Sequence, residues 1–229
     1  TGVSVSLKHY AANNQETDRY NVSVELTERA LREIYMRGFD YAVNLSDPHS
    51  VMTAYNKIMG VHAGQHKGII DVLRGEFGFD GSVMTDWGTQ INRTEMILSG
   101  HDIYCGGFSA EEAIRAEFTN AVKSGNITEA HLDVACENLL KYILKSNAMK
   151  DIPVTNSVSD KAEKLQAIRQ AGAEGTVLLK NDNNTLPLPV STVSLFGNAS
   201  YKTLHSGFGA GYVNVSDVVN ISEGLQHTG

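Results

Sequence analysis

The chain has 229 residues, 41% of them hydrophobic and 20% charged, with 21 glycines and 4 prolines. This composition is typical of a globular protein and excludes the disordered, collagen-like and disulfide-stabilised classes. The formal net charge is −7 and no run of basic residues occurs, which argues against a nucleic-acid partner and an anionic membrane surface. No stretch approaches the ~18 apolar residues of a membrane span, and Cys105 and Cys136 have neither metal-ligand nor redox spacing.

The first part of the chain alternates short strand patterns with helical ones, which predicts βα units and a parallel sheet. Strands are predicted at residues 3–10, 50–55 and 82–86, with a short fourth at 102–105. Helices are predicted at 24–43, through Ile69, Ile70 and Leu73, from a capping box at Ser109 to Lys123, and from Thr128 onward. The last helix would bury a face made of Leu132, Cys136, Leu139, Leu140 and Ile143.

A break in this pattern near residue 150 divides the chain. Pro153 stands in a stretch rich in Ser, Thr and Asn, which is typical of a linker. Beyond it we predict a helix to about Glu174, strands at 176–179 and 193–196, and a glycine-rich loop at 207–211. We therefore expect an α/β domain over residues 1–147, a linker over 148–160 and a second α/β unit over 161–229.

Reactive side chains follow the predicted strands. The first strand ends in Lys8 and His9, Tyr55 ends the second, and Asp86 and Trp87 follow the third. Because the carboxyl ends of parallel strands share one rim of a sheet, we expect these groups to converge. Cations and phenols hydrogen-bond sugar hydroxyls, an indole faces the C–H side of a pyranose, and a carboxylate can attack an anomeric carbon. The set suits a carbohydrate substrate, although an Asp after a strand is also a common helix cap.

Two other patterns are weaker. His62 and His66 have i, i+4 spacing but lack the Glu of a zincin motif between them. The loop at residues 207–211 is glycine-rich but lacks the Lys and Ser of a phosphate-binding loop. We therefore predict neither a metal site nor a bound cofactor.

Asn-x-Ser/Thr sequons are more frequent than composition predicts. Chance gives about two or three, whereas they begin at Asn21, Asn44, Asn92, Asn126, Asn183, Asn198, Asn214 and Asn220. The surplus favours a secreted or periplasmic location over the cytoplasm. An unglycosylated chain rich in Asn and Thr explains it nearly as well.

Four segments carry a more specific signal. They are KHYAANNQETDR at residues 8–19, ERALREIY at 28–35, VMTAYNK at 51–57 and GFDGSVMTDW at 78–87. In order and spacing they closely resemble glycoside hydrolase family 3, the β-glucosidase family. After the linker, VLLKN at 177–181 and LPL at 186–188 resemble the start of that family's second, α/β sandwich domain. The resemblance implies the later half of a (β/α)₈ barrel over residues 1–147 and the first part of the sandwich over 161–229.

The resemblance also implies roles for the candidate residues. Asp86 matches the nucleophile, which forms a covalent glycosyl-enzyme during hydrolysis with retention of configuration. The matches to residues that bind or enclose the sugar are, for its hydroxyls, Lys8, His9 and Arg19, and, for the surrounding wall, Met52, Tyr55 and Trp87. Family members often hold the Lys-His segment through cis peptide bonds. The implied substrate is an oligosaccharide or glycoside with a terminal β-glucosyl or β-xylosyl unit, and no cofactor is implied.

The chain departs from the family pattern in several places. The acid/base Glu lies beyond the matched region, and an Asp and an Arg of earlier strands would precede Thr1. Ala210 stands where relatives commonly have a sugar-contacting Ser. The motif of the N-acetylglucosaminidase branch is absent after His9, which favours the β-glucosidase-like branch. We therefore expect further sequence or a second chain to complete the site around Asp86.

Two alternatives remain open at this stage. The chain can be a catalytically incomplete fragment or a non-catalytic sugar-binding remnant of such an enzyme. It can also be a barrel enzyme in which Lys8 forms a Schiff base, as in aldolases, although the segment around Asp86 argues against this.

Overall fold

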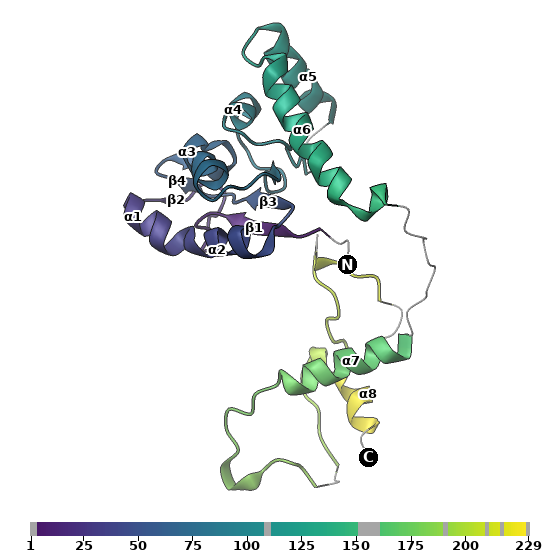
Figure 1. Ribbon diagram of the computed structural model, residues 1–229. Helices are drawn as coiled ribbons and strands as arrows, with labels where there is room; N and C mark the ends of the chain where they lie inside the picture. The colour runs from purple at the N-terminus through teal and green to yellow at the C-terminus, as the bar shows by residue number, and fades with distance from the viewer. Residues whose placement is uncertain are drawn as a thin grey trace. The chain divides into compact units, whose positions relative to one another are not determined.

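The computed structural model describes residues 4–107, 111–150, 161–189, 192–208, 211–215 and 218–227 (Figure 1). The chain divides into two compact units, Thr1–Thr155 and Asn156–Gly229. Over the described ranges, no helix combines the length and the apolar character needed to cross a membrane. Ser109, residues 151–160 of the predicted linker, and Ala210 lie outside the described residues.

A parallel sheet forms the centre of the first unit. Its strands are, in order, β1 (Ser6–Tyr10), β3 (Ser50–Thr53) and β6 (Ser82–Met84). Within this sheet β1 pairs in parallel with β3, and β3 pairs in parallel with β6, with helices in each connection, as expected for βα units. The three main strands predicted from the sequence are thus confirmed, with shorter bounds.

The register aligns the starts of the three strands. Ser50 pairs with both Ser6 and Ser82. The fourth predicted strand, at 102–105, is reduced to a single parallel bridge between Met84 and Ile103. Because the strands start at one level, the residues that follow them emerge at the same rim of the sheet.

A second, smaller sheet was not predicted. It consists of β2 (Ser23–Val24), which runs parallel to β4 (Lys57–Ile58), and β5 (Val61–His62), which is antiparallel to β4. Strands of two residues carry no periodicity, so the sequence pattern does not reveal them. The small sheet fixes the segment after β1 beside the segment after β3.

Helices fill the connections of the first unit. Their bounds are α1 Glu28–Ala30, a π-helical turn Leu31–Tyr35, α2 Arg37–Ser46, a 3₁₀ turn Ala63–Gln65, α3 Lys67–Asp71, a π-helical turn Val72–Glu76, α4 Arg93–Leu98, α5 Glu111–Lys123, α6 Glu129–Lys145 and a 3₁₀ turn Asn147–Met149. In Figure 1, α2 lies along β1, against which it packs, and α6 packs against β6.

The helix predicted at 24–43 begins later than expected. The Thr27 hydroxyl accepts a 3.2 Å hydrogen bond from the Ala30 N–H and caps α1. Ile34, an apolar residue of this segment, is 68% exposed. Met36 is the fully buried residue of this segment, and the partly buried side chains packed against the same core repeat every four residues: Leu31, Tyr35, Phe39 and Val43.

The buried face of α6 also differs from the prediction. Cys136 is exposed and Leu140 is 57% exposed, whereas Ala135 and Asn138 are buried. Asn138 Nδ2 donates a 2.9 Å hydrogen bond to Asp102 Oδ1. Of the predicted face, Leu132 and Leu139 are half-buried, so the predicted apolar face is confirmed only in part.

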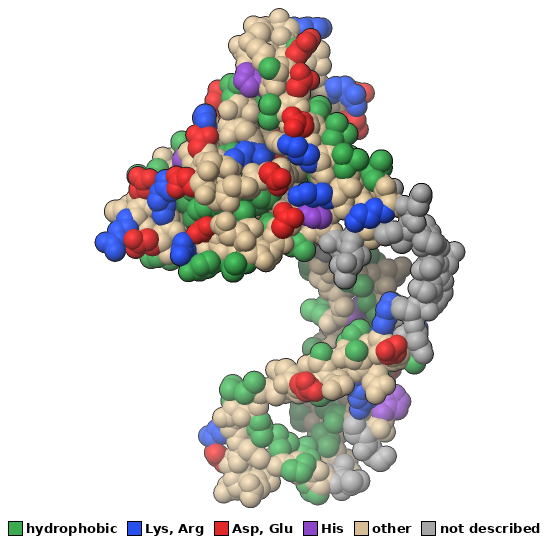
Figure 2. All heavy atoms as spheres, in the orientation of Figure 1, with side chains coloured by type: hydrophobic (Ala, Val, Ile, Leu, Met, Phe, Trp, Pro, Cys, Tyr) green, Lys and Arg blue, Asp and Glu red, His purple; other side chains and the backbone are tan. Residues whose placement is uncertain are grey.

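Acidic and basic side chains alternate on the surface of the first helices. Figure 2 shows red and blue side chains next to one another over α1. Arg29 and Glu33 approach to 3.0 Å, and Arg32 and Glu28 to 2.9 Å. Exposed pairs of this kind contribute at most about 1 kcal/mol each. On this face the basic side chains are paired with acidic ones instead of forming a basic patch.

Two apolar clusters form the core of the first unit. The larger surrounds the sheet and includes Tyr10, Leu73 and Val83, and the smaller includes Met96 and Ile127. The peptide bonds Lys8–His9 and Tyr10–Ala11 are cis, as the resemblance implies for the first of them.

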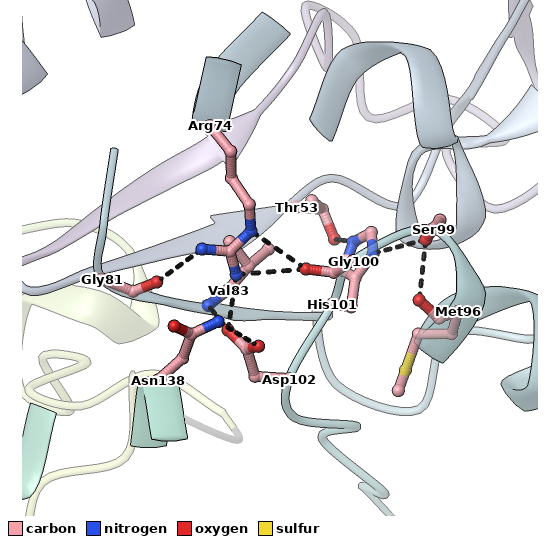
Figure 3. A network of polar contacts seen from close by, with 10 residues as sticks. All are labelled: Thr53, Arg74, Gly81, Val83, Met96, Ser99, Gly100, His101, Asp102 and Asn138. Carbon is pink, nitrogen blue, oxygen red and sulfur yellow. Dashed lines mark hydrogen bonds and ion pairs between the residues drawn. The ribbon is translucent and has the colours of Figure 1, made fainter. Parts of the chain in front are cut away.

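Arg74 connects β6 to its neighbours (Figure 3). Its Nη1 donates to the Gly81 carbonyl at 3.0 Å, and its Nε and Nη2 donate to the Gly100 carbonyl at 3.2 and 3.1 Å. Nη2 also lies 2.7 Å from Asp102 Oδ2, which accepts a further 2.7 Å bond from the Val83 N–H. Burial raises the pKa of Asp102, and these donors oppose that rise. The network fixes the strand that leads to Asp86.

His101 lies beside this network in a fully buried position. Its Nδ1 is 2.9 Å from Ser99 Oγ and its Nε2 is 3.1 Å from Thr53 Oγ1. The Ser99 hydroxyl donates to the Met96 carbonyl at 2.7 Å and the Thr53 hydroxyl donates to the Met84 carbonyl at 3.3 Å, so both hydroxyl oxygens are placed to accept from the imidazole ring. Burial, reinforced by the positive charge of Arg74, lowers the pKa of His101 to about 3.

Acid sensitivity should follow from His101. The pKa of this histidine is 6.5 in the unfolded chain and about 3 in the folded protein. Between pH 6.5 and pH 3 the unfolded chain therefore binds a proton that the folded protein does not. The free energy of unfolding should therefore fall as pH is lowered from 6.5 towards 3, by up to about 1.4 kcal/mol per pH unit. His101→Gln should flatten this slope in urea titrations from pH 7 to pH 4.5. Parallel slopes for the two proteins would contradict the assignment.

In the second unit, the helix predicted after the linker is confirmed. It is α7 (Lys161–Glu174), and a further helix, α8 (Ile221–Gln226), is capped reciprocally by Asn220 and Glu223. Two short 3₁₀ turns, Asp182–Asn184 and Asn198–Ser200, complete the assigned elements of its described residues.

The strands predicted at 176–179 and 193–196 are wrong. Neither segment is a strand in the structure, and both expose apolar side chains, with Leu179 92% and Phe196 88% exposed. A strand requires a partner for its backbone hydrogen bonds, and neither segment has a ladder with another described segment. The strand-favouring residues of these two segments were therefore not sufficient to make either of them a strand.

Candidate active site

Asp86 occupies a constrained turn directly after β6. Asp86 is nearly buried, with 6% of its surface exposed. The segment 103–105 holds the turn, because Thr85 N–H donates to the Ile103 carbonyl at 3.0 Å and Gly88 N–H donates to the Cys105 carbonyl at 2.7 Å. The Thr89 hydroxyl donates to the Asp86 carbonyl at 2.9 Å. The carboxylate is thus carried by backbone that is fixed on both sides.

Two glycines allow this turn to form. Gly88 has φ +64°, a left-handed conformation that glycine adopts without steric cost. Gly107 lies so close to Gly88 that a Cβ on Gly107 would stand 2.9 Å from the Gly88 nitrogen. The close approach of the two backbones therefore requires glycine at position 107.

The carboxylate of Asp86 has two different environments. Oδ1 accepts a 2.8 Å hydrogen bond from the Trp87 N–H. Oδ2 lies 3.4 Å from His9 Nε2, on a histidine that extends from β1. The side chain of His9 is 32% exposed and that of Asp86 is 9% exposed. One oxygen is therefore oriented by backbone, and the other faces a group that can carry a proton or a positive charge.

Tyr55 joins the segments that follow β3 and β6. Its hydroxyl donates a 2.8 Å hydrogen bond to the Trp87 carbonyl. Burial first, and then the negative charge of Asp86, raise the pKa of Tyr55, so the phenol remains a donor. Burial and the same negative charge raise the pKa of the Cys105 thiol. The carboxylate thus influences groups on both neighbouring segments.

Arg19 lies over the ring of Tyr55. Its Cζ is 4.7 Å from the Tyr55 ring centre and 5.1 Å from that of Tyr20. Its Nη1 pairs with Glu16 Oε2 at 2.5 Å. The side chain of Arg19 is 35% exposed, so its guanidinium can still reach a bound molecule.

The structure places the predicted site residues as follows. His9, Asp86, Trp87, Tyr55 and Arg19 form one continuous chain of contacts.

The other two predicted residues differ from this group. Met52 is buried in β3, where it pairs with Met84 of β6. Lys8 is exposed on β1, and among the described residues no hydrogen bond or ion pair joins it to Asp86. The structure therefore brings together five of the seven predicted residues.

Three residues near Asp86 were missed by the sequence analysis. Tyr20 packs against Tyr55 with ring centres 4.5 Å apart and the ring planes tilted by 56°. Cys105 and Gly107 come from the segment after the isolated bridge. Only the position of Tyr20 next to Arg19 gave a signal, because the other two are brought to the site by pairing between distant segments.

His62 and His66 have structural contacts. His66 Nδ1 accepts from the Ile69 N–H at 3.4 Å at the start of α3, and His62 Nδ1 lies 3.2 Å from the Tyr55 carbonyl. Across the described part of the chain, no group of three or more His, Cys, Asp or Glu side chains is arranged to hold a metal ion.

Comparison with known families gives two matches. A family profile described as "Glycosyl hydrolase family 3 N terminal domain" matches residues 1–142. A second, "Glycosyl hydrolase family 3 C-terminal domain", matches residues 176–229. Together they cover both sides of the predicted linker.

Individual relatives point in the same direction. "Beta-glucosidase B" of Emericella nidulans is 39% identical over 98% of this chain and 27% of its own length. "Exo-alpha-(1->6)-L-arabinopyranosidase" of Bifidobacterium longum is 34% identical over all of this chain and 31% of its own length. The solved β-glucosidase 3B from Thermotoga neapolitana, in complex with glycerol, is 38% identical, with a TM-score of 0.82 over 100% of this chain and 33% of that one. The chain therefore spans between a quarter and a third of the length of these relatives.

Proposed function

The chain belongs to glycosyl hydrolase family 3, and from this membership we propose that it forms part of a retaining β-glycosidase. The proposed reaction removes terminal β-linked glucosyl or xylosyl units from oligosaccharides or glycosides. The β-glucosidases among its relatives support the glucosyl assignment. The arabinopyranosidase shows that a relative of similar identity carries the name of a different sugar, so an α-L-arabinopyranoside belongs among the test substrates.

The observation that carries the proposal is the setting of Asp86. Its carboxylate is nearly buried, one oxygen is held by the Trp87 N–H, and the other faces His9. In the proposed first step, a carboxylate oxygen forms a bond to the anomeric carbon while the bond from that carbon to the leaving oxygen breaks. The leaving oxygen keeps the electron pair and takes a proton from an acid, which the family resemblance places outside residues 1–229. Water then releases the sugar with its original configuration.

The neighbouring groups have roles that fit this step. His9 and Arg19 would donate hydrogen bonds to sugar hydroxyls, and the exposed indole of Trp87 would face the ring. Tyr55 would hold the Trp87 backbone through its 2.8 Å bond and so keep the carboxylate in place. The proposal also includes Lys8 and Met52 in the subsite, and only the family resemblance supports their inclusion.

We also propose a finer description of the fold. The first unit would be the later half of a (β/α)₈ barrel, which is supported by three parallel strands that pair in chain order. The second unit would be the first part of an α/β sandwich, which is supported by the match of residues 176–229 to the C-terminal family profile. Residues 148–160 would be the linker between them.

A covalent trap tests the proposal. In the protein at its natural full length, a 2-deoxy-2-fluoro-β-glucoside with a good leaving group should inactivate the enzyme and add one fluoroglucosyl group to the peptide that contains Asp86. The fluorine destabilises the oxocarbenium-like transition state, so the glycosyl-enzyme accumulates. Peptide mass spectrometry locates the label. A label on Lys8 or on another carboxylate would overturn the assignment.

A second candidate function follows from the coverage of the relatives. Because the chain corresponds to only 27–33% of their lengths, a polypeptide of these residues alone can be a catalytically incomplete fragment or a sugar-binding remnant. An assay of the 229-residue chain beside its Asp86→Asn variant with an aryl β-glucoside distinguishes the two candidates, because a fragment or remnant shows no difference between them.

A further inference from the structure

Tyr20 is brought to the candidate site by the small sheet. The Asn21 and Val22 N–H groups both donate to the Asp18 carbonyl at 2.9 Å, which turns the chain directly after Arg19. The Lys57 N–H then donates to the Val22 carbonyl at 2.9 Å, where β2 begins to pair with β4. Since Tyr55 comes two residues before β4, this pairing places Tyr20 against Tyr55.

The contacts of Tyr20 surround the guanidinium of Arg19. The Tyr20 hydroxyl accepts a 3.2 Å hydrogen bond from Arg19 Nη2. The rings of Tyr20 and Tyr55 are 4.5 Å apart at an angle of 56°, and Arg19 Cζ lies within 5.1 Å of both ring centres. With Glu16 on its other amino group, the guanidinium is held by two hydrogen-bonding partners and two aromatic rings. The hydrogen bond to Tyr20 is also the largest factor that raises the pKa of Arg19.

These contacts continue to the carboxylate. Tyr55 donates to the Trp87 carbonyl at 2.8 Å, and the Trp87 N–H donates to Asp86 Oδ1 at 2.8 Å. Tyr55 is 6% exposed, whereas Tyr20 is 46% exposed. Tyr20 is therefore the outer support of a series that ends at Asp86, and both Arg19 and Tyr55 lose a neighbour if it is removed.

We propose that Tyr20 is a positioning residue of the sugar subsite, which holds the Arg19 guanidinium and the Tyr55 ring in the arrangement that receives the sugar hydroxyls. This inference rests on the proposed function. Tyr20 acts through its two neighbours, so its loss should weaken the recognition of particular hydroxyls instead of slowing all substrates equally. Pre-positioned donors lose less conformational freedom on binding, which is the advantage that Tyr20 supplies.

The chain provides a matched control for this experiment. Tyr41 on α2 is 53% exposed and has an arginine over its ring, with Arg37 Cζ at 4.3 Å and an Nη2–hydroxyl distance of 3.0 Å. Tyr41→Leu therefore removes the same kind of Arg–Tyr pair from a helix that contributes no predicted site residue. Tyr20→Leu removes the ring and the hydroxyl, and Tyr20→Phe removes only the hydroxyl.

The experiment compares kinetic constants for 4-nitrophenyl β-glucoside and its monodeoxy derivatives in the full-length protein. Tyr20→Leu should raise KM about 10-fold, the value expected for one lost hydrogen bond to a charged group, while kcat changes less than about 3-fold. In the wild type, removing the sugar hydroxyl that Arg19 binds should raise KM. In Tyr20→Leu this increase should be smaller, whereas the increases caused by removing the other sugar hydroxyls should be unchanged. Tyr20→Phe should lie between Tyr20→Leu and the wild type, and Tyr41→Leu should match the wild type.

The possible results distinguish a failure of the proposed function from a failure of the positioning role of Tyr20. If the wild type hydrolyses none of the glycosides, the proposed function fails. If the wild type is active and Tyr20→Leu behaves like Tyr41→Leu, the positioning role fails. A uniform loss across all monodeoxy substrates also overturns it, because a general structural effect does not distinguish hydroxyls. Should Tyr20→Leu fold poorly by thermal unfolding, Tyr20→Phe applies the same criteria.

Discussion

Asp86→Asn should lower kcat for aryl β-glucosides by at least about 10³-fold in the full-length protein, because an amide cannot form the covalent intermediate. The change keeps the size of the side chain and its acceptor oxygen for the Trp87 N–H, so the turn after β6 should remain intact. Thermal unfolding checks this, and initial rates with saturating substrate measure kcat. Asp80→Asn is the matched control, since Asp80 is exposed and lies 3.7 Å from Lys145.

Chemical rescue adds a stereochemical test of the same residue. In Asp86→Gly, added azide should enter the space of the missing carboxylate, attack the anomeric carbon and yield an α-glucosyl azide. An azide product with retained configuration, or no effect of the substitution, would contradict the nucleophile assignment. A 229-residue chain that binds glucose but whose negligible turnover is unchanged by Asp86→Asn would instead support the sugar-binding remnant.

Asp102→Ala should lower the free energy of unfolding by about 3–5 kcal/mol, the cost of leaving a buried charge without its partner. The Asp102 side chain is 2% exposed and that of Arg74 is 23% exposed. The substitution removes the acceptor of three donors, on Arg74, Val83 and Asn138. Urea unfolding of the full-length protein at pH 7.5 measures the loss.

An exposed ion pair provides the comparison for Asp102. Lys67 and Asp71 pair at 2.5 Å on α3, with side chains 66% and 59% exposed. Asp71→Ala should cost less than about 1 kcal/mol, because solvent screens such a pair. Similar losses for the two variants would show that the Arg74 network contributes no more than a surface contact.

The parallel sheet was predictable because it depends on local patterns. Strands and helices alternate in sequence, and parallel pairing follows from that alternation, so the candidate groups after β1, β3 and β6 could be expected at one rim. The structure brings His9 within 3.4 Å of Asp86, across an interval of 77 positions in the sequence, which agrees with that expectation. What each residue does in the proposed reaction remains a prediction that the trap and the substitutions test.

The features that were missed depend on contacts between distant segments. The pairing of β2 with β4 brings Tyr20 to Tyr55, and it involves only two residues per strand. The bond from Asn138 to Asp102 joins α6 to a segment 36 positions earlier, and it accompanies the burial of a polar residue that the apolar pattern does not predict. In the second unit, residues 176–179 have the composition of a strand, but no strand among the residues that the structure describes there pairs with them. No single window of sequence contains this information.

The position of β3 between β1 and β6 has a consequence for substitutions inside the sheet. Neighbouring strands are about 4.8 Å apart, so the backbones that carry His9 and Asp86 are separated by roughly twice that distance, yet their side chains meet above β3. The strand β3 therefore determines how far apart the two backbones lie, and Thr53 and Ala54 at its end are fully buried. A bulkier residue at either position would push the neighbouring strands apart. The distance between His9 and Asp86 would then change although neither residue is substituted.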